Sequence, residues 1–344
     1  MGLAKGLFMI DTQAYAQRPI DGGPEVDNTS DMLLYHMDRY CVDMAAIKVS
    51  VGYSNEFNAQ MVEKYPNRFI ALCNDSQTQA KAVKGEVAWN IKNATAEIEK
   101  YLATGLYKGI GEGMARDRTF RKKLVPWDER LDQICEVMEL ARKYKVPVNI
   151  HVGLPIGMSG IDLARARAHD ETCDNGNPLL THEVASMYPD VPIIMSHGGV
   201  ELSGYFLQDY ERCLNVAASH KNVFLETCQW WAELYEVPLM DPNIGAKKLV
   251  WGCGWGEPLT QQWMPGKVPT TYNCMNTYEA RPFQHQPDIY GWSLRELGRL
   301  NIPQDDLNLI LGGNAAWLYK VDVPKPGGTH LFKQIDRGFA YGKD

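Results

Sequence analysis

The sequence predicts an α/β protein folded as a single (β/α)8 barrel, and three observations lead to that prediction. Short, β-branched apolar runs alternate with segments whose apolar residues recur at helical spacing, which is typical of a parallel sheet buried on both faces. Two of these runs, 146–152 and 191–197, carry a histidine at their carboxyl end, His151 and His197. Barrel enzymes keep their chemistry at such strand ends. The length of 344 residues suits one barrel with insertions.

The expected strands follow one another along the chain, with helices between most of them. Their apolar runs occupy 7–12, 44–50, 69–73, 107–112, 146–152, 191–197, 223–227 and 248–252. Helical periodicity, caps and stop signals indicate helices at 30–40, 56–65, 95–104, 131–144, 180–188, 209–220, 292–300 and 314–319. Residues 1–344 are therefore expected to form one domain. A long loop insertion at about 255–290, rich in Pro, Gln and Tyr, is of the kind that covers an active site or forms an interface.

The composition indicates what kind of protein this is and which partners to expect. The net charge is −7, with 45% hydrophobic and 22% charged residues; this is typical of a globular protein with a sizeable core and predicts neither a nucleic-acid nor a membrane partner. The apolar start of the chain is short, lacks a small-residue cleavage site and runs into Asp11, so we interpret it as a strand and not as a signal peptide. Eight cysteines without Cys-x-x-Cys spacing favour reduced thiols in a cytoplasmic protein.

Five segments in a fixed order carry a resemblance to a known family. They are 37–43, 63–69, Pro147-Val-Asn-Ile-His151, Ser196-His197-Gly-Gly and 311–316. The chain thereby resembles the amidohydrolase superfamily, in particular its amidohydrolase-related branch, which includes aminocarboxymuconate-semialdehyde decarboxylase and the hydroxybenzoate decarboxylases. The resemblance runs over nearly the whole chain. It implies a distorted (β/α)8 TIM barrel of the metal-dependent hydrolase type.

The resemblance also implies a divalent metal, commonly zinc, at the top of the barrel. The implied ligands are an Asp-x-His-x-His pair on the first strand, a histidine on the fifth or sixth, and an aspartate on the eighth that also performs acid–base work. This chain departs from that pattern. Its first strand reads Asp11-Thr-Gln13-Ala-Tyr15, so Gln13 and Tyr15 stand where the family has histidines, and Gly254 stands where the aspartate belongs. The usual ligand set therefore cannot assemble.

Three potential ligands remain. The fourth strand ends Gly109-Ile-Gly-Glu112-Gly, which directs a carboxylate toward the same mouth as His151 and His197. Two histidines and one carboxylate suffice to hold a divalent ion with open positions, so we expect one divalent metal, with zinc first and iron or manganese as alternatives. The competing interpretations are a structural ion pair for Glu112, a satisfied core position for one histidine and a turn position for the other.

Further residues near the predicted mouth are candidates for other roles. Possible extra ligands are Cys253, Glu257 and Tyr15, although Cys253 also fits a packed strand position. Asp11 and Glu226 are candidate catalytic groups, and Glu226 alternatively orients His197. Pocket-lining candidates are Gln13, Trp230, Trp231, Trp255 and Arg116. For the tryptophans, packing is the alternative, and for Arg116 a solvated loop charge.

These residues leave three functional hypotheses. The first is a metal-binding subunit of a metalloenzyme assembly, weak alone, that acts on a small carboxylate or amide by hydrolysis, decarboxylation or oxygenation. Its partners are a small-molecule substrate and a homologous barrel subunit in a homo- or hetero-oligomer. The second is a self-sufficient mononuclear hydrolase or decarboxylase, and the third is a non-catalytic small-molecule binding barrel. Loss of the family's acid–base position favours the first.

Overall fold

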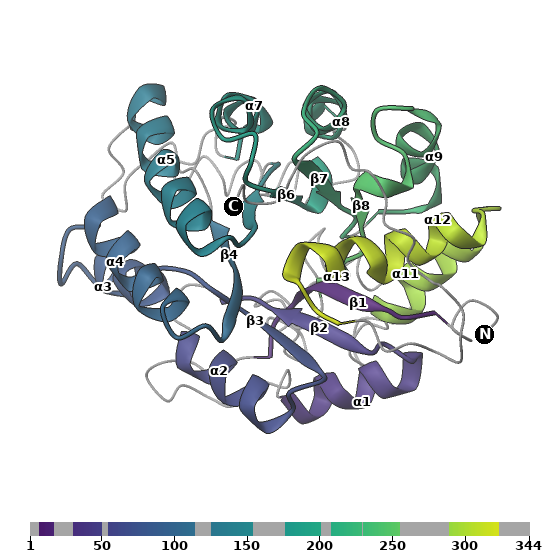
Figure 1. The fold of residues 1–344 in the computed structure, drawn as a ribbon, viewed down its shortest axis with the longest axis horizontal. Helices are drawn as coiled ribbons and strands as arrows, with labels where there is room; N and C mark the ends of the chain where they lie inside the picture. Colours follow the sequence, from purple (N-terminus) through teal and green to yellow (C-terminus); the bar gives the residue numbers. More distant parts are fainter. Residues whose placement is uncertain are drawn as a thin grey trace, which may run out of the picture.

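The computed structural model describes residues 7–16, 30–49, 54–113, 125–153, 176–200, 208–228, 230–254 and 289–322. Eight parallel strands form one sheet in the order of the sequence and curve into a nearly closed barrel (Figure 1). The strands are β1 (Ile10–Ala14), β2 (Met44–Ile47), β3 (Phe69–Cys73), β4 (Tyr107–Gly113), β5 (Val148–His151), β6 (Ile193–Ser196), β7 (Val223–Glu226) and β8 (Leu249–Val250). The predicted (β/α)8 barrel is confirmed.

Backbone hydrogen bonds join the first strand to the segment that follows the last one. The N–H of Thr12 donates to the carbonyl of Trp251 at 3.1 Å, and the N–H of Gly254 donates to the carbonyl of Gln13 at 2.8 Å. Strand β8 is shorter than the predicted 248–252, because the N–H of Trp251 donates to the carbonyl of Ile310, outside the sheet.

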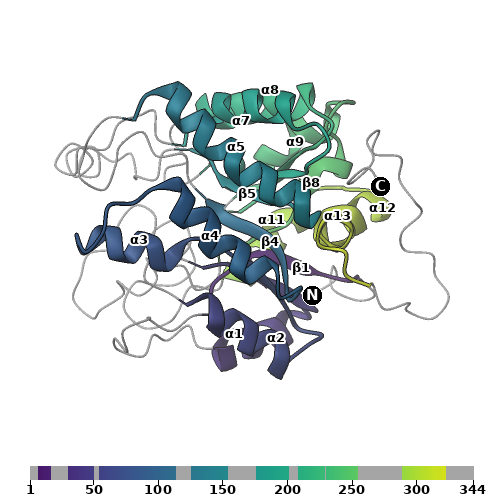
Figure 2. The same ribbon diagram turned by 60° about the vertical axis from the view of Figure 1, so that its left-hand side comes forward.

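Helices surround the barrel on its outer face, as Figures 1 and 2 show from two directions. They are α1 (Ser30–Tyr40), α2 (Asn55–Lys64), α3 (Ser76–Val83), α4 (Ile91–Leu102), α5 (Trp127–Tyr144), α7 (Pro178–Met187), α8 (Gln208–Ser219), α9 (Ala232–Met240), α11 (Ile289–Gly298), α12 (Gln304–Asn308) and α13 (Asn314–Tyr319), with a π-turn over Leu309–Gly313. Among the helices of the described ranges, none is long and apolar enough to cross a membrane.

Three helices were not predicted: α3, α9 and the five-residue α12. The first two have a local reason. Helix α3 carries few apolar residues, and its first turn is capped by Glu97 of α4, which accepts from the N–H groups of Gln77 and Thr78 at 3.0 and 2.8 Å. Helix α9 contains Pro238, which the sequence rules treat as a helix breaker. The first strand was also misplaced at 7–12; pairing with β2 places it at Ile10–Ala14.

The amino-terminal end of the barrel is filled by apolar side chains. Helix α13 contributes Leu318 and Tyr319 to a cluster that also holds Phe8, Ile10 and Met44, from the beginnings of the first two strands. The Tyr319 hydroxyl donates to Asn149 Oδ1 at 3.1 Å inside the barrel. This packing leaves the carboxyl ends of the strands as the place for a polar site.

Candidate metal centre

The predicted carboxylate and the two predicted histidines lie together. Glu112 lies near the end of β4, His151 is the last residue of β5, and His197 directly follows β6. One ligand atom from each side chain lies within 4.8 Å of the other two, and the two imidazole rings are 4.9 Å apart between centroids. Both histidines are buried. Three strand ends thus present one oxygen and two nitrogens to a common point.

One pair of these atoms has the spacing that two ligands of one ion adopt. Glu112 Oε1 lies 3.4 Å from His197 Nε2, longer than the roughly 2.7–3.2 Å of an ordinary N–H···O hydrogen bond. Two ligand atoms on a tetrahedral zinc, each about 2.0–2.1 Å from the metal, stand roughly 3.3 Å apart. The donor set, one carboxylate and two imidazoles, is one that zinc, iron and manganese accept. The residues present therefore fit a divalent metal.

Gln13 and Tyr15 lie at this centre, where they support Glu112. The Tyr15 hydroxyl donates to Glu112 Oε2 at 2.8 Å, and Gln13 Nε2 donates to the same oxygen at 3.2 Å. Gln13 Nε2 also lies 3.2 Å from the Tyr15 hydroxyl. The two side chains occupy Oε2 and so turn Oε1 toward the histidines.

Sequence reasoning missed Lys48, which follows β2 and is fully buried. Its ammonium donates to Gln13 Oε1, to Ser196 Oγ at 3.1 Å and to Glu226 Oε1 at 3.2 Å. It also lies 4.0 Å from Glu112 Oε1. The available signal was a lysine inside the apolar segment 44–49, because a buried ammonium needs anionic or polar partners.

The charged side chains at the centre shift the pKa values of Glu112 and Lys48. Burial alone would raise the pKa of Glu112, but Lys48, His151 and His197 together hold that pKa well below its ordinary value. Burial alone would lower the pKa of Lys48, and the carboxylates of Glu112 and Glu226 raise it instead. Near neutral pH the centre therefore contains an ionised carboxylate, as a metal ligand requires, beside an ammonium ion.

Glu226, from the end of β7, holds the backbone of His197. Its Oε2 accepts the N–H of His197 at 3.1 Å, and its Oε1 accepts the Thr12 hydroxyl at 3.0 Å. Trp230 Nε1 donates to the carbonyl of His197 at 2.9 Å. Trp230 is fully buried against Tyr210 and Tyr235, so the ring packs behind the histidine.

Asp11 joins the first strand to the segment after β8 and to α11. Its carboxylate accepts from the N–H groups of Gln13 and Cys253 at 2.9 and 3.0 Å and from the Tyr290 hydroxyl at 2.8 Å. Burial raises its pKa to about 7. Cys253 is buried, and burial raises the pKa of its thiol well above the ordinary value. Both positions are thus part of the packed seam that closes the barrel.

The remaining predicted residues divide into two groups. Trp231, at the beginning of α9, is half-buried and packs against the hydrophobic core. The other predicted positions lie outside the described residues; they are Arg116, Trp255 and Glu257.

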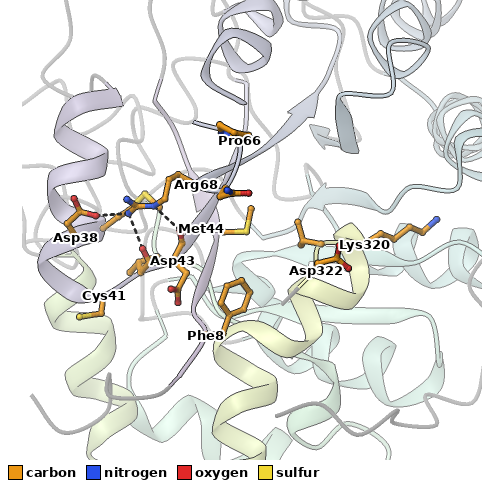
Figure 3. Close-up of a pocket in the computed structure, with 13 residues that line it drawn as sticks. Phe8, Asp38, Cys41, Asp43, Met44, Pro66, Arg68, Lys320 and Asp322 are labelled. Atoms are coloured by element: carbon orange, nitrogen blue, oxygen red, sulfur yellow. Dashed lines mark hydrogen bonds and ion pairs between the residues drawn. The ribbon is translucent and has the colours of Figure 1, made fainter. Parts of the chain in front are cut away.

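A cavity of about 660 Å³ lies at the opposite end of the barrel (Figure 3). It is lined by Phe8, by Met44 at the start of β2 and by Arg68. Arg68 forms an ion pair with Asp38 at 2.7 Å and donates to the carbonyl of Asp43 at 2.9 Å. These residues lie before or at the amino-terminal ends of the strands, so this cavity is separate from the candidate metal centre.

Comparison with known proteins identifies a matching family and several solved structures with a similar fold. The family model described as "Amidohydrolase" matches residues 10–321. Among solved structures, an uncharacterized TIM-barrel protein from Bordetella bronchiseptica is 15% identical, with a TM-score of 0.57 over 92% of this chain and 99% of that one. A dihydroxybenzoic acid decarboxylase from Polaromonas sp. JS666, with bound manganese and the inhibitor 2-nitroresorcinol, is 15% identical, with a TM-score of 0.53 over 92% and 97%.

A third solved structure, an amidohydrolase from Burkholderia multivorans with bound zinc, is 9% identical, with a TM-score of 0.51 over 92% of this chain and 100% of that one. At these identities the likenesses show the barrel fold. No curated protein matches the sequence.

Proposed function

The chain belongs to the amidohydrolase family, and we propose that it is a metal-binding subunit of a metalloenzyme assembly that acts on a small carboxylate or amide. The convergence of Glu112, His151 and His197 within 4.8 Å carries the proposal. These three residues would hold one divalent ion, with zinc expected first and iron or manganese as alternatives. The zinc and manganese in two structural neighbours support this choice of metals.

A bound ion of this kind polarises a substrate carbonyl or acidifies a water. The chain's own contribution is a prearranged support for it. Tyr15 and Gln13 fix the orientation of Glu112, and Glu226 with Trp230 fixes the backbone of His197. Side chains held in this way keep a ligand in place at little entropic cost on binding.

The engagement of two candidate bases supports a function in an assembly. Asp11 accepts three hydrogen bonds in the seam between β1 and α11. Glu226 accepts from Thr12, Lys48 and the N–H of His197. Both of these carboxylates are thus committed to structural bonds, and Glu257, the third candidate base, lies outside the described residues. We propose that a homologous barrel subunit supplies the proton-transferring group.

The family and one structural neighbour, the Polaromonas decarboxylase, support a choice of substrates to assay. Dihydroxybenzoic acid is the substrate named for the Polaromonas decarboxylase, so hydroxybenzoates are the first compounds to assay, by release of carbon dioxide. Hydrolysis of the corresponding small amides and oxygenation of the carboxylates are the reactions to assay next.

Metal content and turnover should be measured on the chain alone and co-expressed with a homologous barrel chain. One ion per chain with turnover only in the complex supports the proposal. Turnover by the chain alone identifies a self-sufficient enzyme, and metal binding with no turnover in either sample identifies a binding barrel. The double variant His151→Ala/His197→Ala should contain no metal, whereas His182→Ala/His220→Ala, on the exposed pair between α7 and the end of α8, should keep it.

A further inference from the structure

We propose that the Lys48 ammonium is a permanent cation at one of two neighbouring cation positions, and that it limits the centre to one metal ion. The inference rests on the proposed metal site at Glu112, His151 and His197. In this proposal Lys48 is not a metal ligand. Its ammonium supplies the positive charge that a second metal ion would otherwise bring to the same oxygen atoms.

Oxygen atoms from four different strands surround the Lys48 nitrogen. They belong to Gln13 on β1, Glu112 on β4 at 4.0 Å, Ser196 on β6 at 3.1 Å and Glu226 on β7 at 3.2 Å. Amide, hydroxyl and carboxylate oxygens are the donors that hard divalent cations such as Mn²⁺ and Mg²⁺ take. The ammonium has three N–H groups, and these are directed at Gln13, Ser196 and Glu226.

The two cation positions share one carboxylate oxygen. Glu112 Oε1 lies 3.4 Å from His197 Nε2 on one side and 4.0 Å from Lys48 on the other. An ion bound by Glu112 and the histidines is therefore a close neighbour of the ammonium. One divalent ion together with Lys48 brings three positive charges to the two negative charges of Glu112 and Glu226, so a further dication would meet strong repulsion. Without Lys48 the same ion would only balance the two carboxylates, and the oxygens around the vacated position would be open to a second ion.

Two substitutions of Lys48 distinguish the effect of its positive charge from the effect of the space that its side chain fills. The side chain is fully buried, so Lys48→Ala leaves a space lined by the four oxygens and removes the positive charge. Lys48→Met removes the same charge but fills the space with an apolar chain. A second ion needs both the negative environment and the room, and only the alanine variant offers both.

The experiment is Mn²⁺ binding to the full chain, measured by elemental analysis after gel filtration and by electron paramagnetic resonance. The wild type is expected to hold one ion with an uncoupled signal. Lys48→Ala is expected to hold two ions whose signals are coupled by their short separation, and Lys48→Met to hold one. Lys48→Ser, which also removes the charge and leaves the space open, replaces the alanine variant if that protein does not fold.

The outcomes distinguish the two proposals. One ion in both the wild type and the alanine or serine variant overturns the role of Lys48 and leaves the metal site standing. Two ions in the wild type overturn it as well. No Mn²⁺ or Zn²⁺ in the wild type overturns the metal site itself, and the inference with it. The double variant Lys48→Ala/Glu226→Gln, which lacks the second carboxylate, should return to one ion.

Discussion

The Glu226 carboxylate holds the backbone N–H of His197 at 3.1 Å, immediately beyond the end of β6. His197 has a φ of 62°, which costs a residue with a Cβ about 1–2 kcal/mol. Glu226 on the N–H and Trp230 on the carbonyl therefore stabilise a backbone turn that His197 would not adopt unaided. The turn aims the imidazole at Glu112, so the proposed metal site would depend on residues that do not touch the ion.

Replacing Trp230 by Phe tests this dependence. A smaller aromatic ring remains, but the indole N–H that bonds the His197 carbonyl is lost. We expect unfolding to become easier by about 1–3 kcal/mol and zinc to bind about 10-fold more weakly, as measured by calorimetric titration. The matched control is Trp127→Phe, whose indole N–H donates to Glu183 at 2.9 Å outside the centre. Equal zinc affinity in the two variants would contradict the role of Trp230.

Tyr15→Phe removes the shorter of the two side-chain hydrogen bonds to Glu112 Oε2. The carboxylate then loses part of its orientation, and we expect zinc affinity to fall roughly 10-fold or more. Tyr210→Phe removes an equally buried hydroxyl, which donates to the Leu234 carbonyl at 2.6 Å, and should leave affinity unchanged. Competition with a chromogenic chelator measures both. An unaltered zinc affinity in Tyr15→Phe would show that Gln13 alone positions Glu112.

Asp11 predicts a pH dependence of stability. Its pKa is about 7 in the folded chain against 3.8 for a free side chain, so the unfolded state releases the proton more readily. The stabilising contribution of the protonated group is fully present below pH 3.8 and is lost as the pH rises through 7, by roughly 4 kcal/mol in all. Denaturant unfolding of the wild type and Asp11→Asn at pH 5 and pH 8 checks this. The wild type should lose stability relative to Asp11→Asn between these values; a constant difference would refute the assignment.

Gly111 is expected to be irreplaceable. An added Cβ would lie 2.7 Å from both the Cβ and the carbonyl oxygen of Asn149 on β5, at a φ of 135°. Gly111→Ala should therefore destabilise the fold by about 3 kcal/mol or more and displace the neighbouring Glu112, with loss of metal. Gly105→Ala is the control, because its φ is 76° but no atom lies within 4 Å of the added Cβ. It should cost about 1–2 kcal/mol in thermal unfolding and bind metal normally.

The barrel and the three convergent side chains were predictable because both follow from local patterns. Parallel strands align their carboxyl ends, so a polar residue at the end of each apolar run identifies Glu112, His151 and His197 without knowledge of contacts. The sequence also showed that Gln13 and Tyr15 are not the family's histidines. It did not show what they do, because their partner Glu112 lies 99 and 97 residues away.

Lys48 and the short helices were missed for related reasons. A lysine in an apolar run is ambiguous until its acceptors are known, and these come from Ser196 and Glu226, 148 and 178 residues further along. Helix α3 depends on a cap from another helix, supplied by Glu97. Tertiary contacts of this kind override local propensity.

Helix α13 packs across the amino-terminal end of the barrel, with Leu318 and Tyr319 among the first residues of the strands. In the part of the barrel that the structure describes, a molecule reaching Glu112 therefore approaches along the barrel axis from the carboxyl ends of the strands. Product departure and substrate arrival would share that route and compete for it. A subunit docked over that face would govern both at once, which makes turnover sensitive to how tightly the two barrels are joined.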